Sequence, residues 1–270
     1  MLRFLTAGES HGPTLTAILE GIPAGLALDT DYINAELARR QIGYGSGGRM
    51  NIERDEIHIT SGVAAGLTTG APLALWVENR DFKNWRDKNI EPMTTPRPGH
   101  ADLTGAIKYG YRELRIALER ASARETTMRV AVGAVCQKFL AEFGILIGGY
   151  VTQIGSVVAS IDPALPYDQR LIAAEANDVR CPDAVSAERM HEEIRQVKVD
   201  KDTLGGVIEV VALGVPPGLG SHVQFDRRLD AKIVAAMVSV HAMKGAEIGE
   251  AFENAGKRGS DVHDEIGVTE

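Results

Sequence analysis

The sequence has few aromatic residues and only two cysteines, and these shortages exclude several classes of protein. Phe, Trp and Tyr make up 5% of the 270 residues, so an aromatic-lined binding surface is not expected. Cys136 and Cys181 are too few for a disulfide framework or a four-cysteine metal site, and we expect two free thiols, with Cys136 buried. No apolar run approaches the roughly 20 residues that span a bilayer. We therefore expect a cytoplasmic protein without a membrane partner.

Positive charge is also in short supply. The chain has 29 Lys plus Arg against 37 Asp plus Glu, a formal net charge of −8, which argues against nucleic acid as a partner. With 44% apolar and 24% charged residues, the composition is that of a globular protein with a large core. Because no Pro- or Ser-rich linker interrupts the chain, we expect a single domain over residues 1–270.

Short strand-like segments alternate with longer helical ones. Strands are predicted at Arg3–Ala7, Leu15–Leu19, Glu56–Ile59, Leu73–Glu78, Tyr150–Ile154 and Val207–Leu213. Helices are predicted at Asp31–Gln41, Ala123–Phe143, Tyr167–Asn177, Ser186–Val197 and Ala231–Val240. The third and fourth of these helices are acidic and look exposed, and the last looks buried.

One pattern occurs twice. Gly21-Ile-Pro-Ala-Gly25 follows the second predicted strand, and Gly214-Val-Pro-Pro-Gly218 follows the last one. In both places an Asp-containing helix start comes next. The pattern fits either a common Gly-Pro turn or a duplication that gives the domain two similar halves.

Two histidines lie in glycine-containing turns. His11 is in Gly8-Glu-Ser-His-Gly12, between two predicted strands, and His100 follows Arg97 in Arg-Pro-Gly-His. A histidine on such a turn is well placed to meet a ligand and to transfer protons near neutral pH. Asp102 begins the next helix, so the alternative for the second loop is an N-cap with His100 as an exposed neighbour.

The stretch Glu119–Thr126 combines a helix start with positive charge. Ser122 and Glu125 have the spacing of a capping box at the head of a long helix. Arg120, Arg124 and Arg129 surround that helix end, and such a terminus is also a site for phosphate. The alternative is that Glu119 and Glu125 pair with these arginines.

Other familiar site patterns are not found. Gly43–Gly48 matches G-x-G-x-x-G, but it follows a helix and precedes a strand, the reverse of the dinucleotide-binding arrangement. The sequence has no P-loop, no nucleophile elbow and no His or Cys pair at metal-ligand spacing, so no metal is expected. Together the residues predict a protein that binds phosphorylated small molecules and moves protons.

The motifs resemble those of the chorismate synthase family. The matching stretches are Gly8–Gly12 through Glu20–Pro23, the Arg39–Arg49 loop, Arg97–Asp102, Arg120–Thr126 and Lys244–Gly249, in the family's order over nearly the whole chain. The resemblance implies an α+β fold, a β-α-β sandwich with long helices between antiparallel sheets and pseudo-symmetric halves, assembled as a homotetramer. It also implies anti-1,4-elimination of phosphate from 5-enolpyruvylshikimate 3-phosphate to give chorismate, with reduced FMN as cofactor.

The resemblance also assigns roles to residues. His11 is expected to protonate the leaving phosphate and His100 to control protonation of the flavin. Ser10, Arg40, Arg97, Arg124 and Arg129 are expected to bind substrate, and Arg120, Ala121, Ser122, His241 and Ala242 to bind FMN. NADPH, which some members use as reductant, is assigned to Arg40 and Ser46, although the family usually has arginine where Ser46 stands.

Members of the family continue past the position of Glu270, through a glycine-rich flavin loop and an Arg-Ser-Asp motif. Because neither occurs in this sequence, we expect the chain to lack the family's C-terminal portion. The alternative to an active lyase is a non-catalytic flavin-binding or assembly module of the same fold. A phosphosugar or nucleotide transferase is disfavoured because the P-loop is missing.

Overall fold

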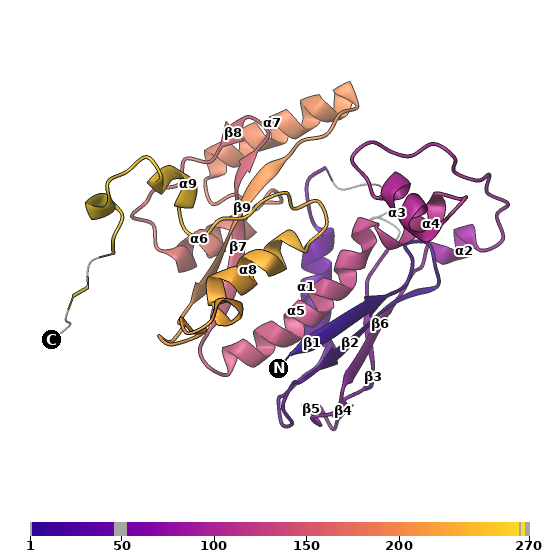
Figure 1. The fold of residues 1–270 in the computed structure, drawn as a ribbon, viewed down its shortest axis with the longest axis horizontal. Helices are drawn as coiled ribbons and strands as arrows, with labels where there is room; N and C mark the ends of the chain where they lie inside the picture. The colour runs from indigo at the N-terminus through magenta and orange to yellow at the C-terminus, as the bar shows by residue number, and fades with distance from the viewer. Residues whose placement is uncertain (1, 46–52, 265, 268–270) are drawn as a thin grey trace. The chain divides into compact units, whose positions relative to one another are not determined.

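The structure is a computed structural model that describes residues 2–45, 53–264 and 266–267 (Figure 1). Contacts along the chain divide it into two compact units, Met1–Val215 and Pro216–Glu270, and each unit is described by itself. That both belong to one domain stays a prediction.

A four-stranded antiparallel sheet forms the first layer of the N-terminal unit. Its strands are β1 (Arg3–Ala7), β2 (Thr14–Glu20), β6 (Leu73–Glu78) and β3 (Ile57–Ser61), in that spatial order. Alternate residues of the two central strands are buried, and Ala17 lies opposite Leu75 in the register. This alternation, which the sequence shows, aims one face of the sheet at the core.

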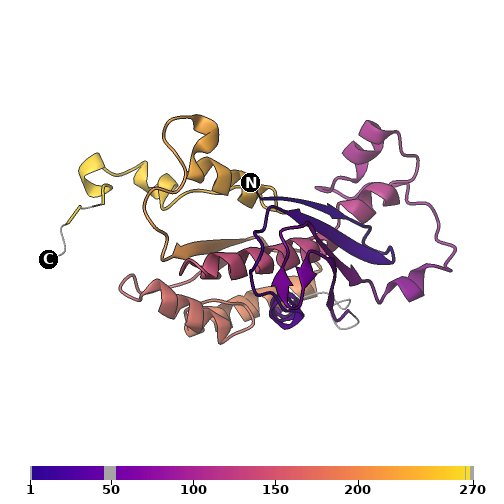
Figure 2. The ribbon, with the colours of Figure 1, turned by 90° about the horizontal axis from the view of Figure 1, so that it is seen from below.

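Two helices cover that face. The first, α1 (Thr30–Gln41), begins where the Asp29 carboxylate accepts a hydrogen bond from the Tyr32 N–H, and it buries Ile33 and Leu37. The second, α5 (Thr126–Ala141), buries a stripe that includes Met128 and Val135. Helix α5 packs against α1 and the four-stranded sheet, and Figure 2 shows the same arrangement after a 90° turn.

A second antiparallel sheet lies on the other side of α5. It consists of β8 (Val157–Val158), β7 (Leu146–Ile154) and β9 (Gly206–Leu213), with β7 in the centre and in contact with α5. Helices α6 (Tyr167–Glu175) and α7 (Ala184–Asp200) pack on β7. The α+β sandwich, with a long helix between antiparallel sheets, is therefore confirmed.

A smaller core under α7 explains the placement of the cysteines. Cys181 is fully buried there with Met190 and Val157, whereas Cys136 on α5 is only half-buried at the edge of the main core. Both thiols are free, as expected. The prediction that Cys136 is buried is wrong, because Cys181 is the buried cysteine and Cys136 is only half-buried. Burial raises the pKa of both thiols, which keeps them protonated and unreactive at neutral pH.

The sequence patterns do not predict four short elements. These are the hairpin of β4 (Val63–Ala64) and β5 (Leu67–Thr68) and the helices α2 (Phe82–Trp85) and α4 (Arg115–Arg120), all too short to show a clear hydrophobic period. The helix expected to begin at Asp102 is present as α3 (Asp102–Tyr109). The first residues of the helix predicted at Ala123–Phe143 form the 3₁₀ turn η2 (Ala123–Glu125).

The repeated Gly-Pro pattern has the same backbone form in both places. Gly21 and Gly25 have φ angles of 95° and 93°, and Gly214 and Gly218 have 71° and 96°. Each pair joins a strand to a helix, β2 to α1 and β9 to α8 (Leu229–Val238). Because these angles favour glycine, the pattern needs glycine at the same two positions in both loops, which fits a common Gly-Pro turn as well as a duplication.

The C-terminal unit differs from expectation. Its described residues form η3 (Phe225–Arg227), α8, α9 (Ala251–Asn254) and η4 (Gly259–Asp261). The prediction that α8 is buried is wrong, because Ile233 and Val238 are exposed and no residue of the helix is buried. The described part of this unit has only helices and loops, so the unit itself supplies no sheet to pack against the apolar side of α8.

No helix in the described ranges is long and apolar enough to cross a membrane. Among the same residues, no group of three or more His, Cys, Asp or Glu side chains could hold a metal ion.

The burial of α1 can be tested with one substitution at two places. Ile33 on α1 is fully buried, whereas Ile172 on α6 is 73% exposed. Ile33→Ala should lower the free energy of unfolding by about 2–5 kcal/mol, because it leaves a cavity in the core. Ile172→Ala should change it by less than about 0.5 kcal/mol. Urea unfolding followed by circular dichroism measures both, and similar losses would contradict the placement of α1.

Candidate functional site

The turn between β1 and β2 carries Ser10 and His11. Its backbone is docked onto the end of α4, where Ser10 N–H donates to the Glu119 carbonyl (3.1 Å) and His11 N–H donates to Glu119 Oε2 (2.7 Å). Gly8 has a φ of 107°, and a Cβ there would lie 2.4 Å from the Thr14 carbonyl oxygen. The turn therefore requires glycine at this position, as its sequence suggested.

The His11 imidazole lies between a carboxylate and an indole. Its Nδ1 is 2.7 Å from Glu119 Oε1, and its ring centroid is 4.1 Å from that of Trp85. Burial alone would raise the pKa of Glu119, but the hydrogen bonds from His11 outweigh it and hold this pKa below its usual value. The carboxylate is ionised at neutral pH, so Nδ1 must donate the proton of that bond. The alternative in which Glu119 pairs with an arginine is therefore wrong for its closest side-chain contact, which is His11.

Ser122 links this turn to the start of the long helix. Its hydroxyl donates to Ser10 Oγ (3.1 Å) and accepts from the Arg124 N–H (3.3 Å), so Ser122 is the N-cap of η2. Only half of the predicted capping box forms, because the Glu125 carboxylate is taken by Thr6 and Arg129. The two hydroxyls predicted to bind substrate and flavin are therefore in contact.

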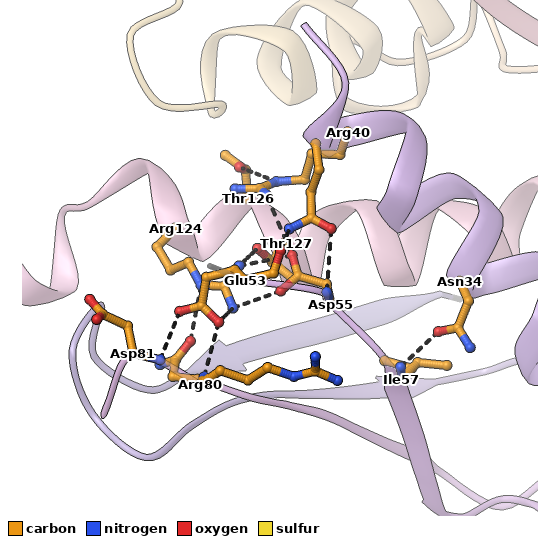
Figure 3. Close-up of polar contacts among 12 residues, drawn as sticks. Asn34, Arg40, Glu53, Asp55, Ile57, Arg80, Asp81, Arg124, Thr126 and Thr127 are labelled. Atoms are coloured by element: carbon orange, nitrogen blue, oxygen red, sulfur yellow. Dashed lines mark hydrogen bonds and ion pairs between the residues drawn. The ribbon is translucent and has the colours of Figure 1, made fainter. Parts of the chain in front are cut away.

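Arg124 is at the centre of a buried network (Figure 3). Its Nε donates to Asn79 Oδ1 (2.9 Å), and Nη1 and Nη2 contact the Asp55 carboxylate at 2.8 and 2.7 Å. A second carboxylate, Glu53, lies 3.6 Å from Nη2 and accepts the Arg80 N–H. Arg124, Asp55 and Glu53 are 6%, 5% and 2% exposed, so these charges depend on one another for solvation.

Arg40 joins the network from the last turn of α1. Its Nη1 is 3.5 Å from Asp55 Oδ2, and its Nε donates to Thr126 Oγ1 at the start of α5. The next residue, Gln41, donates to the Glu53 carbonyl and accepts from the Asp55 N–H. With Arg40 included, two arginines face two buried carboxylates, and the end of α1 is fixed beside the start of α5.

A more exposed chain of polar contacts runs along the other side of α5. Arg120 Nη2 donates to the carbonyl and hydroxyl oxygens of Thr6, and Thr6 Oγ1 donates to the Glu125 carboxylate at 2.6 Å. Arg129 pairs with the same carboxylate, as the four-residue spacing suggested, and lies over the Phe4 ring. This chain joins strand β1 to α4 and α5, and the Arg120 side chain is exposed.

Arg97 and His100 contact residues of their own loop. The Arg97 guanidinium forms a two-point pair with the buried Asp102 carboxylate, at 2.9 and 3.0 Å, and Arg97 N–H binds it too. Asp102 is the first residue of α3 but not its N-cap, which is Ala101. The hydrogen bond from the Arg97 side chain is the main cause of the lowered pKa of Asp102. His100 is exposed, with Nδ1 2.8 Å from the Pro98 carbonyl.

The remaining predicted site residues are Ser46, His241 and Ala242. Ser46, assigned to NADPH, is outside the described residues. His241 and Ala242 belong to the C-terminal unit, just after α8. Ala242 has a φ of 67°, a strained angle for a residue with a Cβ, and such strain is found most often at functional sites.

Sequence reasoning missed the residues that hold the predicted ones in place. These are Glu53, Asp55, Asn79, Trp85 and Glu119. For Glu119, what the sequence did not predict is its main partner, His11. The only sequence signal of these residues is being polar or aromatic beside a predicted strand or helix. Each lies 45 to 108 positions from the Arg124 or His11 side chain that it contacts, as with Asn79 and Arg124 at 45 and Glu119 and His11 at 108.

Fold and site together define a class. The site combines a histidine hydrogen-bonded to a carboxylate, two hydroxyl groups in contact with each other, and several arginines. On an α+β sandwich, this combination is typical of an enzyme that acts on phosphorylated anions. A sequence model of the chorismate synthase family matches residues 2–270. The chain therefore belongs to the chorismate synthase family.

Individual relatives agree with this assignment. The chain is 54% identical to the chorismate synthase of Aquifex aeolicus, over all of this chain and 72% of that protein. It is also 54% identical to the chorismate synthase of Geobacillus kaustophilus, over 98% of this chain and 71% of that one. A crystal structure of chorismate synthase superposes with a TM-score of 0.86 at 50% identity, covering 99% of this chain and 74% of that one.

The buried network predicts a strong contrast between neighbouring carboxylates. Asp55→Ala should destabilise the protein by about 3–5 kcal/mol, because it leaves Arg124 buried without its main ion-pair partner. Glu56→Ala removes an exposed carboxylate that pairs with Arg80 and should have little effect. Thermal unfolding monitored by circular dichroism compares the two variants. Equal losses would show that the Arg124 network is not a main source of stability.

Proposed function

We propose that the chain catalyses the anti-1,4-elimination of phosphate from 5-enolpyruvylshikimate 3-phosphate, which gives chorismate. As a member of its family, the chain is a carbon–oxygen lyase of the shikimate pathway. In the reaction the C3–O bond to phosphate breaks, a C6 hydrogen is lost, and no net oxidation occurs. The observation that carries the residue assignments is the geometry of the His11 turn. Glu119 fixes this turn by accepting hydrogen bonds from the His11 backbone N–H and from Nδ1 of the His11 ring.

His11 is the proposed general acid for the leaving phosphate. With Nδ1 donating to Glu119, the opposite ring nitrogen, Nε2, has no hydrogen-bond partner among the described residues. When the ring is protonated, Nε2–H can be given to a phosphate oxygen as the C–O bond breaks. Ser10, on the same turn, is proposed to bind the substrate through its hydroxyl.

The arginines neutralise the anionic substrate in this proposal. Arg129 is half-buried, and its Nε pairs with the Glu125 carboxylate, so its charge is held at a fixed position near the start of α5. Arg40, Arg97 and Arg124 are already paired with carboxylates, and each therefore contributes charge from a fixed position. Such prearranged cations stabilise a departing phosphate better than mobile ones, because they do not reorganise during the reaction.

Reduced FMN is the proposed cofactor, and the residues at the head of α5 fit it. The exposed Arg120 guanidinium offers the cation that an anionic flavin needs. Ala121 has a small side chain that leaves room for the cofactor, and Ser122 follows it with its hydroxyl fixed by Ser10. His241 and the strained Ala242 are proposed to complete the contacts, with His100 controlling flavin protonation. When bound, reduced FMN supplies electron density to the allylic system of the substrate.

Two further assignments rest on the resemblance alone. Arg40 and Ser46 are proposed to bind NADPH as a source of electrons for the flavin. The chain is proposed to assemble as a homotetramer. A cytoplasmic location is proposed from the sequence, which has no apolar run of membrane-spanning length.

The alternative function, a flavin-binding or assembly module without turnover, is disfavoured by the family and by the names of the relatives. Anaerobic turnover with reduced FMN separates the two. Release of phosphate by this chain supports the lyase, and flavin binding without phosphate release supports the module.

A histidine substitution tests the general acid. His11→Ala should lower the rate of phosphate release at least about a hundredfold, because the leaving group loses its proton donor. His58→Ala is the matched control, since His58 is exposed on β3 and stacked on Trp76. The assay uses anaerobic 5-enolpyruvylshikimate 3-phosphate with reduced FMN. Wild-type turnover in His11→Ala would rule out this role.

The flavin contact is tested by binding. Arg120→Met should weaken FMN binding at least about tenfold, because a charge-assisted hydrogen bond to the cofactor is lost. Arg112→Met changes an exposed arginine eight positions earlier in the chain and should leave the affinity unchanged. Titration of FMN fluorescence gives both dissociation constants, and equal values for the two variants would remove Arg120 from the flavin site.

A further inference from the structure

We propose that Glu119 is a positioning residue that holds His11 in the tautomer and orientation needed to protonate the substrate. The proposal rests on the function assigned above, in which His11 is the general acid. Glu119 reaches His11 across 108 positions of sequence, from the last turn of α4.

The contact has two points, and both come from one residue. Oε2 of Glu119 accepts the His11 backbone N–H at 2.7 Å, and Oε1 lies 2.7 Å from Nδ1 of the same histidine. The Glu119 carbonyl also accepts the Ser10 N–H at 3.1 Å. The backbone and side chain of His11 are thus fixed to the same short stretch of α4, which sets the direction of Nε2.

Only a carboxylate can make both contacts while His11 is able to act as an acid. The two His11 donors meet different oxygens of Glu119, and an ionised carboxylate offers both as acceptors. An amide offers one oxygen and one NH₂ group. If its oxygen takes the backbone N–H, its NH₂ faces Nδ1 and requires Nδ1 to be a bare acceptor. The imidazole is then held as the neutral Nε2–H tautomer and resists taking up a second proton.

The surroundings keep the pair intact. Trp85 covers the imidazole with its indole ring, and Asp81 fixes that indole by accepting Nε1–H at 2.9 Å. The Lys88 Nζ atom lies over the same indole, 5.3 Å from the centroid of the Trp85 ring. Arg115, also on α4, favours the charged form of Glu119. Glu9 is the remaining titratable residue of the His11 turn.

The proton balance of the step is simple. The Nε2–H bond of the imidazolium breaks and an O–H bond forms on the leaving phosphate. The Nδ1–H bond to Glu119 stays in place, so His11 becomes the neutral Nδ1–H tautomer and Glu119 remains a carboxylate. Glu119 therefore acts through His11 and not on the substrate, as the orienting acid of a catalytic triad acts through its histidine.

The test compares the same substitution at two glutamates. Glu119→Gln should move the NMR titration midpoint of the ¹⁵N-labelled His11 imidazole to lower pH and shift its neutral form to the Nε2–H tautomer. It should lower kcat at least about tenfold with a smaller change in KM, because binding contacts stay. Since His11 must be protonated to act, the loss of kcat with rising pH should begin at a lower pH.

Glu113→Gln is the matched control. Glu113 Oε1 accepts the Met93 and Arg115 N–H groups at the start of α4, and a Gln oxygen can accept both. This variant removes one charge from the same region without touching His11, so its His11 titration and its pH profile should match those of the wild type. Circular dichroism of both variants confirms that they fold.

The double variant separates this proposal from the proposed function. In a His11→Ala background, Glu119→Gln should cause no further loss of kcat, because the residue through which it acts is gone. An equal loss in both backgrounds, or an unchanged His11 titration in Glu119→Gln, would overturn the proposal. Wild-type turnover in His11→Ala would instead overturn the general-acid role, and the NMR titration would still report on the Glu119 contact.

Discussion

The buried ion pair between Arg124 and Asp55 is the constraint on which the site depends. Asp55 precedes the outer strand β3, and Arg124 lies in the 3₁₀ turn that leads into α5. Neither group can be buried alone, because an unpaired charge in the interior costs several kcal/mol. Their contact therefore fixes the head of the central helix against the sheet, and Arg40 and Asn79 bind the same pair from α1 and the end of β6.

The position of the His11 turn follows from that anchor. Once the head of α5 is fixed, Ser122 is held where its hydroxyl reaches Ser10, and the preceding helix α4 brings Glu119 to His11. The turn that carries His11 is thus supported from two sides by segments far away in sequence. A turn with this support keeps its geometry without a ligand, which is what preorganisation of a site means.

The acidic net charge of −8 takes on a different meaning with the structure. Several arginines of the motifs are already balanced by carboxylates, such as Arg97 by Asp102 and Arg129 by Glu125. In the described part of the chain, these arginines are held in fixed positions by buried carboxylates. Such an arrangement presents directional donors to an anionic ligand while the protein as a whole stays acidic.

The sequence by itself determined the regular elements and the chemistry of the motifs. Alternation in Leu73–Glu78 and the capping Asp29 gave a strand and a helix that the structure confirms, because burial of one face leaves a periodic signal. The same logic failed for α8, whose apolar side needs a cover that composition does not reveal. Only the tertiary structure decided which charges meet: that Glu119 binds His11 and not an arginine, and that Asp55 neutralises Arg124. Pairs so distant in sequence follow no period, and only the packing of α4, α5 and the sheet brings them together.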